Sequence, residues 1–136
     1  MQQPWLLCGD FNEIGDVSEK KGGAPCDMLQ IRRFRDWIDD CNLINLGFKG
    51  TRFTWRGPLW SNGCRIFKRL DRTLCNAEWS LRFQDAIVGT LPRVRSDHYP
   101  LLIRCERRSG CPTAKPFSFE YMWMQHCEWN QLRTSQ

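Results

Sequence analysis

The stretch Leu6–Asn12, with the sequence LLCGDFN, decides how this chain folds. A short apolar run ends in Gly-Asp-Phe-Asn and the chain then turns polar, which is typical of a buried strand whose end presents reactive side chains. Asp10 and Asn12 lie two residues apart, so both point to the same side of an extended backbone and could together hold a water molecule or a phosphate oxygen. The alternative is a strand that ends in ordinary turn residues, because Asp and Asn favour turns.

Two further polar motifs follow along the chain. The sequence KRLDR occupies residues 68–72, and RSDHYP occupies residues 95–100, directly before the apolar Leu101–Ile103. Taken singly, Asp71 would ordinarily belong to a surface ion pair, and His98 would more often be structural. Neither residue is convincing alone, and it is the order of the three motifs along the chain that carries information.

In this order and approximate spacing, the Gly-Asp-Phe-Asn, Arg-Leu-Asp and Ser-Asp-His motifs resemble the C-terminal half of the endonuclease/exonuclease/phosphatase superfamily. That superfamily includes abasic-site endonucleases, deoxyribonuclease I and the endonucleases of LINE-type (non-LTR) retrotransposons. The segments PWLLCGDFN (residues 4–12) and FTW (residues 53–55) are most similar to the plant retrotransposon branch. The resemblance implies an α/β fold, namely the C-terminal half of a four-layered, deoxyribonuclease I-like α/β sandwich with mixed or antiparallel sheets flanked by helices.

The resemblance also divides the chain. Residues 1–105 correspond to a partial endonuclease/exonuclease/phosphatase domain, and residues 106–136 to a linker and an aromatic-rich tail that resembles the segment leading to a reverse transcriptase. In the family, an asparagine and the principal metal-binding glutamate precede the Gly-Asp-Phe-Asn strand. We therefore expect a half-domain, or the product of a truncated gene.

Five residues receive catalytic roles from the resemblance. Asp10 and Asn12 match residues that position the attacking water or the transition-state oxygens. Asp71 matches the carboxylate that orients a phosphate-contacting histidine, which is matched by His98. Asp97 matches a carboxylate at or near the metal site. The complete family domain uses Mg²⁺ or Mn²⁺, and we expect weak metal binding, or none, in this chain.

The basic residues are unevenly distributed. Residues 1–60 hold eight Lys/Arg and eight Asp/Glu, whereas residues 61–115 hold eleven against five, within an overall net charge of +5. A basic zone beside a site suited to phosphate chemistry favours a polyanionic substrate, although a solvated basic face is the alternative. In the resembled endonucleases a hairpin in this region lies against DNA. The residues expected to contact DNA are Thr54, Trp55, Arg56, Asn62, Arg65, Lys68 and Arg95.

The remaining pattern predicts the main elements. An amphipathic helix is expected from about residue 28 to 41, capped by Asp27, with its apolar stripe in the core. A hairpin follows, with strands at residues 52–56 and 65–74 and a loop that begins at Gly57. A short helix is expected at residues 76–83, with Asn76 as its cap and Trp79 packed on Phe83. Strands are expected at residues 86–91 and 99–105, the second of them buried.

Composition excludes several classes of protein. With 41% hydrophobic and 26% charged residues, the chain is typical of a globular protein. It has no apolar run of membrane-spanning length and no secretory signal. The eight cysteines include no C-x-x-C pair, which argues against a zinc cluster. We interpret those in apolar runs, such as Cys8 and Cys105, as buried in a reducing compartment, nuclear or cytoplasmic; a secreted disulfide framework is the alternative.

Three functions remain open. The first is a fragment of a LINE-type, DNA-nicking endonuclease that is catalytically incomplete. The second is a phosphatase of the same superfamily, acting on phosphomonoesters or lipid phosphates, which the basic hairpin and the retrotransposon-like tail disfavour. The third is a non-catalytic nucleic-acid-binding remnant. The expected partners are DNA and either the other half of the domain or a reverse transcriptase domain, with no membrane.

Overall fold

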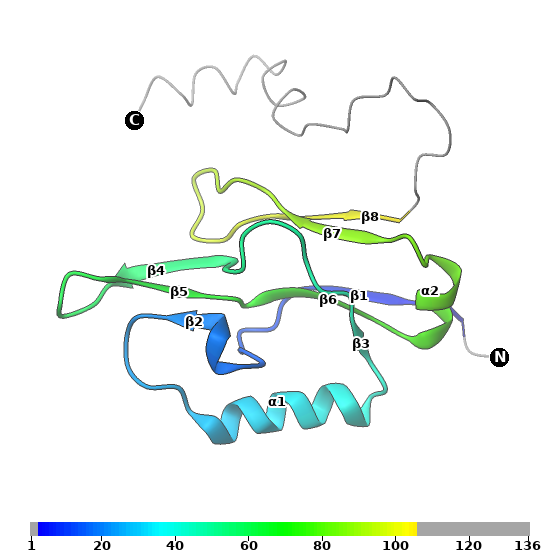
Figure 1. Cartoon of the computed structure of the whole chain (residues 1–136), viewed down its shortest axis with the longest axis horizontal. Helices are drawn as coiled ribbons and strands as arrows, with labels where there is room; N and C mark the ends of the chain where they lie inside the picture. The colour runs from blue at the N-terminus through cyan, green and yellow to red at the C-terminus, as the bar shows by residue number, and fades with distance from the viewer. Residues whose placement is uncertain (1–2, 106–136) are drawn as a thin grey trace, which may run out of the picture.

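A computed structural model describes residues 3–105, which form three small antiparallel sheets and two α-helices (Figure 1). In chain order the elements are β1 Leu6–Asp10, a 3₁₀ turn at Val17–Glu19, β2 Lys20–Lys21, α1 Met28–Asp40, β3 Ile44–Asn45, β4 Trp55–Leu59, β5 Arg65–Lys68, β6 Asp71–Cys75, α2 Ala77–Arg82, β7 Ile87–Thr90 and β8 Leu101–Arg104. The prediction of an α/β protein with antiparallel sheets is confirmed. The prediction for residues 106–136 lies outside the described residues.

The strands are arranged in the orders β1-β6-β3, β2-β5-β4 and β7-β8. The first two sheets lie end to end in the middle of the molecule, with α1 on one side and the β7–β8 pair on the other (Figure 1). Backbone bonds join the layers: the Lys49 amide donates to Val88 O at 2.7 Å, and the Thr90 amide donates to Lys49 O at 3.2 Å. The loop before β4 is therefore held against β7.

Both helices begin where the sequence predicts. The Asp27 carboxylate accepts hydrogen bonds from two amides of the first turn of α1, at 2.9 and 3.3 Å. Ile31 and Phe34 of α1 are buried, but Met28 is 62% exposed and Trp37 is 40% exposed. The prediction that the whole apolar stripe is core is therefore wrong, because the central sheets are narrow and cover only the middle of that helix face.

Helix α2 is capped as expected. The Asn76 side chain accepts a hydrogen bond from the Trp79 amide at 3.1 Å, which satisfies an amide that the first turn would leave unpaired. The rings of Trp79 and Phe83 pack with their centroids 4.8 Å apart. Trp79 is buried, so this pair holds the end of α2, the helix that follows β6, in place.

Strand β1 is less buried than its apolar sequence predicts. Leu7 is 39% exposed and Cys8 is exposed. Within the part of the chain that the structure describes, β1 pairs with β6 alone and is an edge strand, so one side of it has no strand to cover it. The expectation of a buried strand is wrong for β1, whereas β6 is buried from Arg72 to Cys75.

The outermost strand pair shows the same effect. The sequence predicts that β8 is buried, yet its apolar residues are only half-buried and Arg104 is exposed. The reason is that β7 and β8 form a two-stranded sheet on the outside of the central strands. Of the six cysteines in the described residues, all of them free, Cys75 is buried, while Cys8 is exposed and Cys105 is half-buried. The prediction of buried thiols at Cys8 and Cys105 is therefore wrong.

The expected strand at residues 65–74 is two strands in two different sheets. β5 pairs with β4 and β2, whereas β6 pairs with β1 and β3. At the junction the amides of Leu70 and Asp71 both donate to Thr54 Oγ1 at 2.9 Å, and the Arg69 amide donates to Glu19 O at 2.8 Å. Because other segments satisfy these amides, the strand can leave one sheet and enter the next.

The hairpin between β4 and β5 exists, but its turn is later than predicted. Strand β4 (Trp55–Leu59) includes Gly57 and Pro58, which the sequence pattern assigns to the loop. Pro58 is tolerated because β4 is an edge strand and its register with β5 shifts within this segment. The turn occupies residues 60–64, where the Trp60 amide donates to Cys64 O at 2.7 Å.

A buried ion pair lies beneath β6. Arg72 is 1% exposed and its guanidinium binds both carboxylate oxygens of Glu19, at 2.7 and 3.2 Å. Arg69, 2% exposed, stacks on the Phe48 ring with its guanidinium carbon 3.8 Å from the ring centroid. Burial, followed by the charge of Arg72, lowers the pKa of Arg69 to about 10. The negative charge of Glu19 thus compensates the positive charges of these two buried guanidinium groups.

Among residues 3–105 no helix combines the length and the apolar character needed to cross a membrane.

Candidate functional site

Three chain segments meet at one end of the β1–β6 pair. Asp10, the last residue of β1, lies directly opposite Asp71, the first residue of β6, in the antiparallel register. His98 comes from the loop between β7 and β8, which reaches down to the central strands through a bridge between Trp55 and His98. We predicted that five residues converge, and Asp10, Asp71 and His98 do so, whereas Asn12 and Asp97 lie beside the group without joining its ligand atoms.

The His98 ring lies between the two carboxylates. Its Nδ1 atom is 2.8 Å from Asp71 Oδ2, and its Nε2 atom is 3.7 Å from Asp10 Oδ2. The predicted hydrogen bond between Asp71 and His98 is therefore confirmed. An Nδ1–H that donates to Asp71 leaves Nε2 facing Asp10 and the solvent, which is the orientation that a proton-transferring imidazole requires.

The charges around the ring set its protonation. Burial disfavours the imidazolium, but the hydrogen bond and charge of Asp71, followed by the charges of Asp10 and Asp97, outweigh it, so the pKa of His98 is raised above its ordinary value of 6.5. The His98 side chain is 31% exposed and that of Asp71 is 14% exposed. The site is thus open on the Asp10 side and closed on the Asp71 side.

The raised pKa predicts how stability depends on pH. Protonated His98 is bound more favourably in the folded chain than in the unfolded chain, so its contribution is fully present below about pH 6.5 and disappears as the pH rises through the folded-state pKa. We expect the free energy of unfolding of the wild-type chain to fall, relative to that of His98→Asn, as the pH rises from about 6.5 through the folded-state pKa of His98. Urea titrations at several pH values would measure this, and two parallel curves would contradict the assignment.

Asn12 lies beside Asp10 in a left-handed conformation. Its φ angle is 56°, and its amide donates to Asp10 Oδ1 at 2.8 Å. Asn tolerates this conformation better than most residues because its short polar side chain can bond locally. The bond fixes one oxygen of the Asp10 carboxylate and leaves Oδ2 on the side of His98. Asn12 itself is exposed, so its predicted contact with substrate oxygens stays a prediction.

Asp97 lies next to the site but its carboxylate is bound elsewhere. Asp97 Oδ2 accepts a hydrogen bond from the Trp55 indole at 3.0 Å. This bond and a backbone hydrogen bond lower the pKa of the Asp97 carboxyl. The side chains in the described residues whose ligand atoms lie within 4.8 Å of one another are those of Asp10, Asp71 and His98, without Asp97. The assignment of Asp97 as the metal ligand stays a prediction, and this geometry gives it no support.

The ligand atoms of the site are of types that bind divalent cations, but they are few. Two carboxylates supply the oxygen ligands that Mg²⁺ prefers, whereas the third group is an imidazole, which suits transition metals better. Both carboxylates are also engaged, Asp71 with His98 and Asp10 with the Asn12 amide. Asp10 Oδ2 is the oxygen best placed to hold a cation, so we expect weak binding by these residues.

The residues predicted to contact DNA separate into two groups. Thr54 is 0% exposed and its hydroxyl accepts the Leu70 and Asp71 amides. Its assignment to the DNA-facing set is therefore wrong, because it is a structural residue at the β5–β6 junction. Of the others, Asn62 and Arg95 are exposed, and the remaining ones are half-buried on β4 and β5, namely Trp55, Arg56, Arg65 and Lys68.

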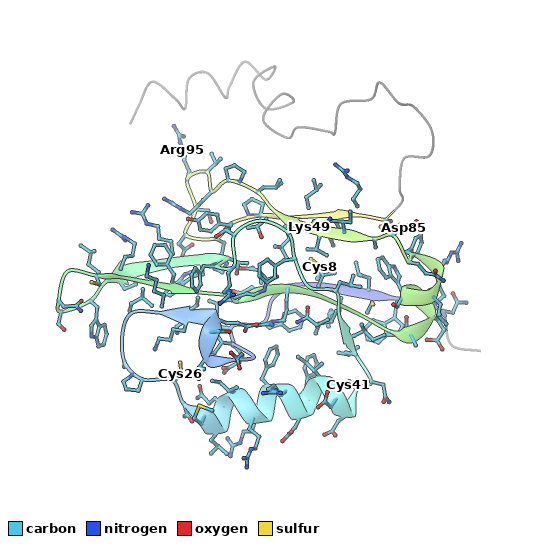
Figure 2. The ribbon with its side chains drawn as sticks, viewed as in Figure 1. Cys8, Cys26, Cys41, Lys49, Asp85 and Arg95 are labelled. Carbon is cyan, nitrogen blue, oxygen red and sulfur yellow. The ribbon has the colours of Figure 1, made fainter. Side chains whose placement is uncertain are left out.

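The basic surplus of residues 61–115 is smaller at the surface than in the sequence. Arg69 and Arg72 belong to it and are both buried. Arg95 lies on the outer side of the β7–β8 loop and points away from the body of the molecule (Figure 2). The guanidinium of Arg65 donates to Gly57 O at 2.9 Å, and Lys68 Nζ lies 5.6 Å from the centroid of the Trp55 ring. Arg65, Lys68 and Arg95 therefore place cations along the hairpin and the His98 loop, while Arg82 on α2 and Arg104 on β8 are exposed elsewhere.

Ser96 belongs to the Ser-Asp-His motif, but no role in the site was predicted for it. Its hydroxyl accepts a hydrogen bond from the His98 amide at 3.1 Å, and its carbonyl accepts one from the Arg93 guanidinium at 2.6 Å. Both bonds shape the turn that carries His98 toward Asp71. The signal was present in the sequence, because a serine two residues before a functional side chain in a loop is typical of such a turn.

Comparisons of this chain with protein-family models, with curated proteins and with solved structures found no match. Its function is therefore inferred from the residues of the site and their geometry.

Proposed function

We propose that Asp10, Asp71 and His98 form part of a metal-dependent phosphodiesterase site that nicks DNA, as in the LINE-type endonucleases that the sequence resembles. The observation that supports this most directly is the placement of the His98 ring, 2.8 Å from Asp71 and 3.7 Å from Asp10. An imidazole held by one carboxylate and facing another can move a proton between water and a phosphate oxygen.

The roles follow from the atoms. Asp71 holds His98 in one tautomer and stabilises its charged form, so that the ring can contact a phosphoryl oxygen as a cation. Asp10, whose Oδ2 is free of the Asn12 amide, accepts the proton of the attacking water. The water oxygen bonds to phosphorus as the bond from phosphorus to the leaving oxygen breaks, and protonated His98 gives that oxygen a proton. The Asn12 side chain hydrogen-bonds the phosphoryl oxygens that stay on phosphorus. A bound Mg²⁺ would supply further positive charge for the phosphoryl oxygens and the leaving oxygen.

We further propose that the described residues are one half of a four-layered sandwich and that a second segment completes the site. Two observations support this part. Leu7 and Cys8 of the edge strand β1 are exposed, and the carboxylates of the site are few and already engaged. A partner half would cover β1 and add the missing oxygen ligand. The 136-residue chain alone should then nick DNA weakly or not at all.

A nicking assay on supercoiled plasmid tests the proposal. The chain would be assayed alone and with the upstream half of a related element, with and without Mg²⁺. We expect nicking only with both the second half and the metal. Robust nicking by the chain alone, lost in Asp10→Ala, would support the proposed active site. It would contradict the proposal that a second half is needed to complete it. Phosphate release from inositol phosphates, without nicking, would identify a phosphatase instead, and inactivity of the complete pair would favour the non-catalytic remnant.

DNA binding by the chain gives a separate prediction. If the accessible cations bind phosphates, affinity should fall steeply with salt, and replacing Arg65, Lys68 and Arg95 together with Ala should lower the slope of log affinity against log salt by about 0.9 for each phosphate that is no longer neutralised. The loss of affinity should be equal for all sequences, since phosphate contacts carry no sequence information. Fluorescence anisotropy with labelled duplexes at several salt concentrations measures both quantities.

The control removes the same charge elsewhere. Arg32, Arg33 and Arg35 are exposed on α1, on the opposite side of the central sheets from the His98 loop. Replacing these three with Ala should leave the slope nearly unchanged. Equal losses of affinity in the two triple variants would mean that DNA binding depends on net charge alone. An affinity independent of salt would mean that Arg65, Lys68 and Arg95 do not bind DNA phosphates.

A further inference from the structure

Trp55 contacts the His98 loop through its side chain, and its two neighbours in the chain, Thr54 and Arg56, contact the loop through their backbones. The indole Nε1–H donates to Asp97 Oδ2 at 3.0 Å. On either side of it, the Arg56 amide donates to Asp97 O at 2.8 Å and the Tyr99 amide donates to Thr54 O at 2.7 Å. The start of β4 therefore holds the loop at the residues directly before and after His98.

The indole fits where it does because residue 57 is a glycine. A Cβ atom built on Gly57 would overlap Cη2 of the Trp55 ring and lie 2.5 Å from its Cζ3, far inside van der Waals contact. Gly57 does not have a positive φ angle, so glycine is required here because a larger side chain would not fit. The ring lies across the Gly57 backbone, packs against the cluster of Ile14, Ile31 and Leu70, and is thereby fixed in direction.

We propose that Trp55, lying against Gly57, is a positioning residue that binds the Asp97 carboxylate outside the catalytic group and so reserves the His98 ring for Asp71 and Asp10. This rests on the proposed function, because it assigns Trp55 and Asp97 to the support of that site. It also gives Trp55 a role other than DNA contact and Asp97 a role other than metal ligand. Without the indole N–H, a third carboxylate next in sequence to His98 is free to approach the ring.

The inference predicts that Trp55 acts on His98 through Asp97. A double-mutant cycle on the full chain, with His98 titrated by NMR, compares wild type, Trp55→Phe, Asp97→Asn and the double variant. Phe keeps an aromatic ring for packing but removes the N–H donor. We expect Trp55→Phe to shift the His98 titration to higher pH in the wild-type background, and to have no effect in the Asp97→Asn background.

Trp60 provides the matched control. It is 45% exposed in the β4–β5 turn, and Trp60→Phe should leave the His98 titration unchanged. An equal shift from Trp55→Phe with and without Asp97, or no shift in a folded Trp55→Phe variant, would overturn the proposal. Neither outcome depends on nicking, so a failure here is separable from a failure of the proposed function.

A second measurement applies even where Trp55→Phe fails to fold. In Asp97→Asn, the acceptor of the indole proton loses its charge and the Trp55 Nε1–H should exchange with solvent about tenfold faster, as loss of a charged hydrogen bond implies. The Trp60 indole should exchange at an unchanged rate in the same spectra. Unaltered exchange at Trp55 would show that Asp97 does not hold the indole and would end the inference.

Discussion

Replacing Glu19 with glutamine is expected to remove a large part of the chain's free energy of unfolding. Glu19 is the carboxylate that binds the Arg72 guanidinium, which is 1% exposed. Removing one partner of a buried pair leaves the other charge uncompensated and costs about 3–5 kcal/mol. A small domain has roughly 5–15 kcal/mol in total. Urea denaturation followed by tryptophan fluorescence should show the midpoint falling to a small fraction of the wild-type value.

The cost should exceed that of an ordinary buried pair. Arg69 is also buried nearby, and Arg69 Nη2 and Arg72 Nε have no hydrogen-bond partner among the described residues. Glu19 Oε2 additionally accepts from the Gly15 amide at 2.6 Å, and the neutral oxygen of a glutamine would bind this amide less strongly. Asp85→Asn, at an exposed position, removes the same charge as a control and should change stability little. Equal effects of the two variants would mean that the Glu19 pair contributes no more than a surface charge.

Under the proposed function, replacing His98 with alanine should reduce nicking by the chain and its second half by about 10²–10⁴-fold, the usual contribution of a positioned acid or base. The loss should appear in kcat with little change in KM, because the DNA-facing cations are untouched. Rates measured on supercoiled plasmid with the second half and Mg²⁺ present would test it. Asp71→Asn should give a smaller loss, since the ring remains but its orientation and charge are no longer fixed.

The chain contains a second histidine that serves as the control. His126 lies outside the described residues, and His126→Ala removes a second imidazole while Asp10, Asp71 and His98 are all kept. It should nick at the wild-type rate. A His98→Ala variant that nicked as well as His126→Ala would exclude His98 from the reaction and with it the proposed mechanism.

Local signals in the sequence were enough to place most elements. Asp27 and Asn76 indicate the starts of α1 and α2 because capping depends on residues within one turn. The Asp71–His98 contact was predicted from the order of three motifs, and no local pattern would have indicated it. Burial was predicted less well. The apolar sequence of β1 suggested a covered strand, but exposure depends on which strands lie beside it.

The errors around residues 54–72 have a common physical cause. Thr54 was interpreted as a surface residue of a β-favouring run, and the segment at residues 65–74 as a single strand. Both depend on one tertiary contact, the Thr54 hydroxyl with the Leu70 and Asp71 amides. Arg72 likewise counted as a surface cation, because sequence gives no indication that Glu19, far away along the chain, lies beside it. Long-range pairing decides these positions, and propensity does not.

The assembly of the site from β1, β6 and the loop before β8 also has a consequence for how the chain folds. Asp10 reaches Asp71 only when the first and sixth strands pair, and His98 reaches Asp71 only when the β7–β8 loop is in place. Contacts between residues so distant in sequence require large loops to close, and they slow the folding of a small domain. The reactive group is therefore among the last features to form. A nascent or partly folded chain therefore carries Asp10, Asp71 and His98 without the contacts that bring them together.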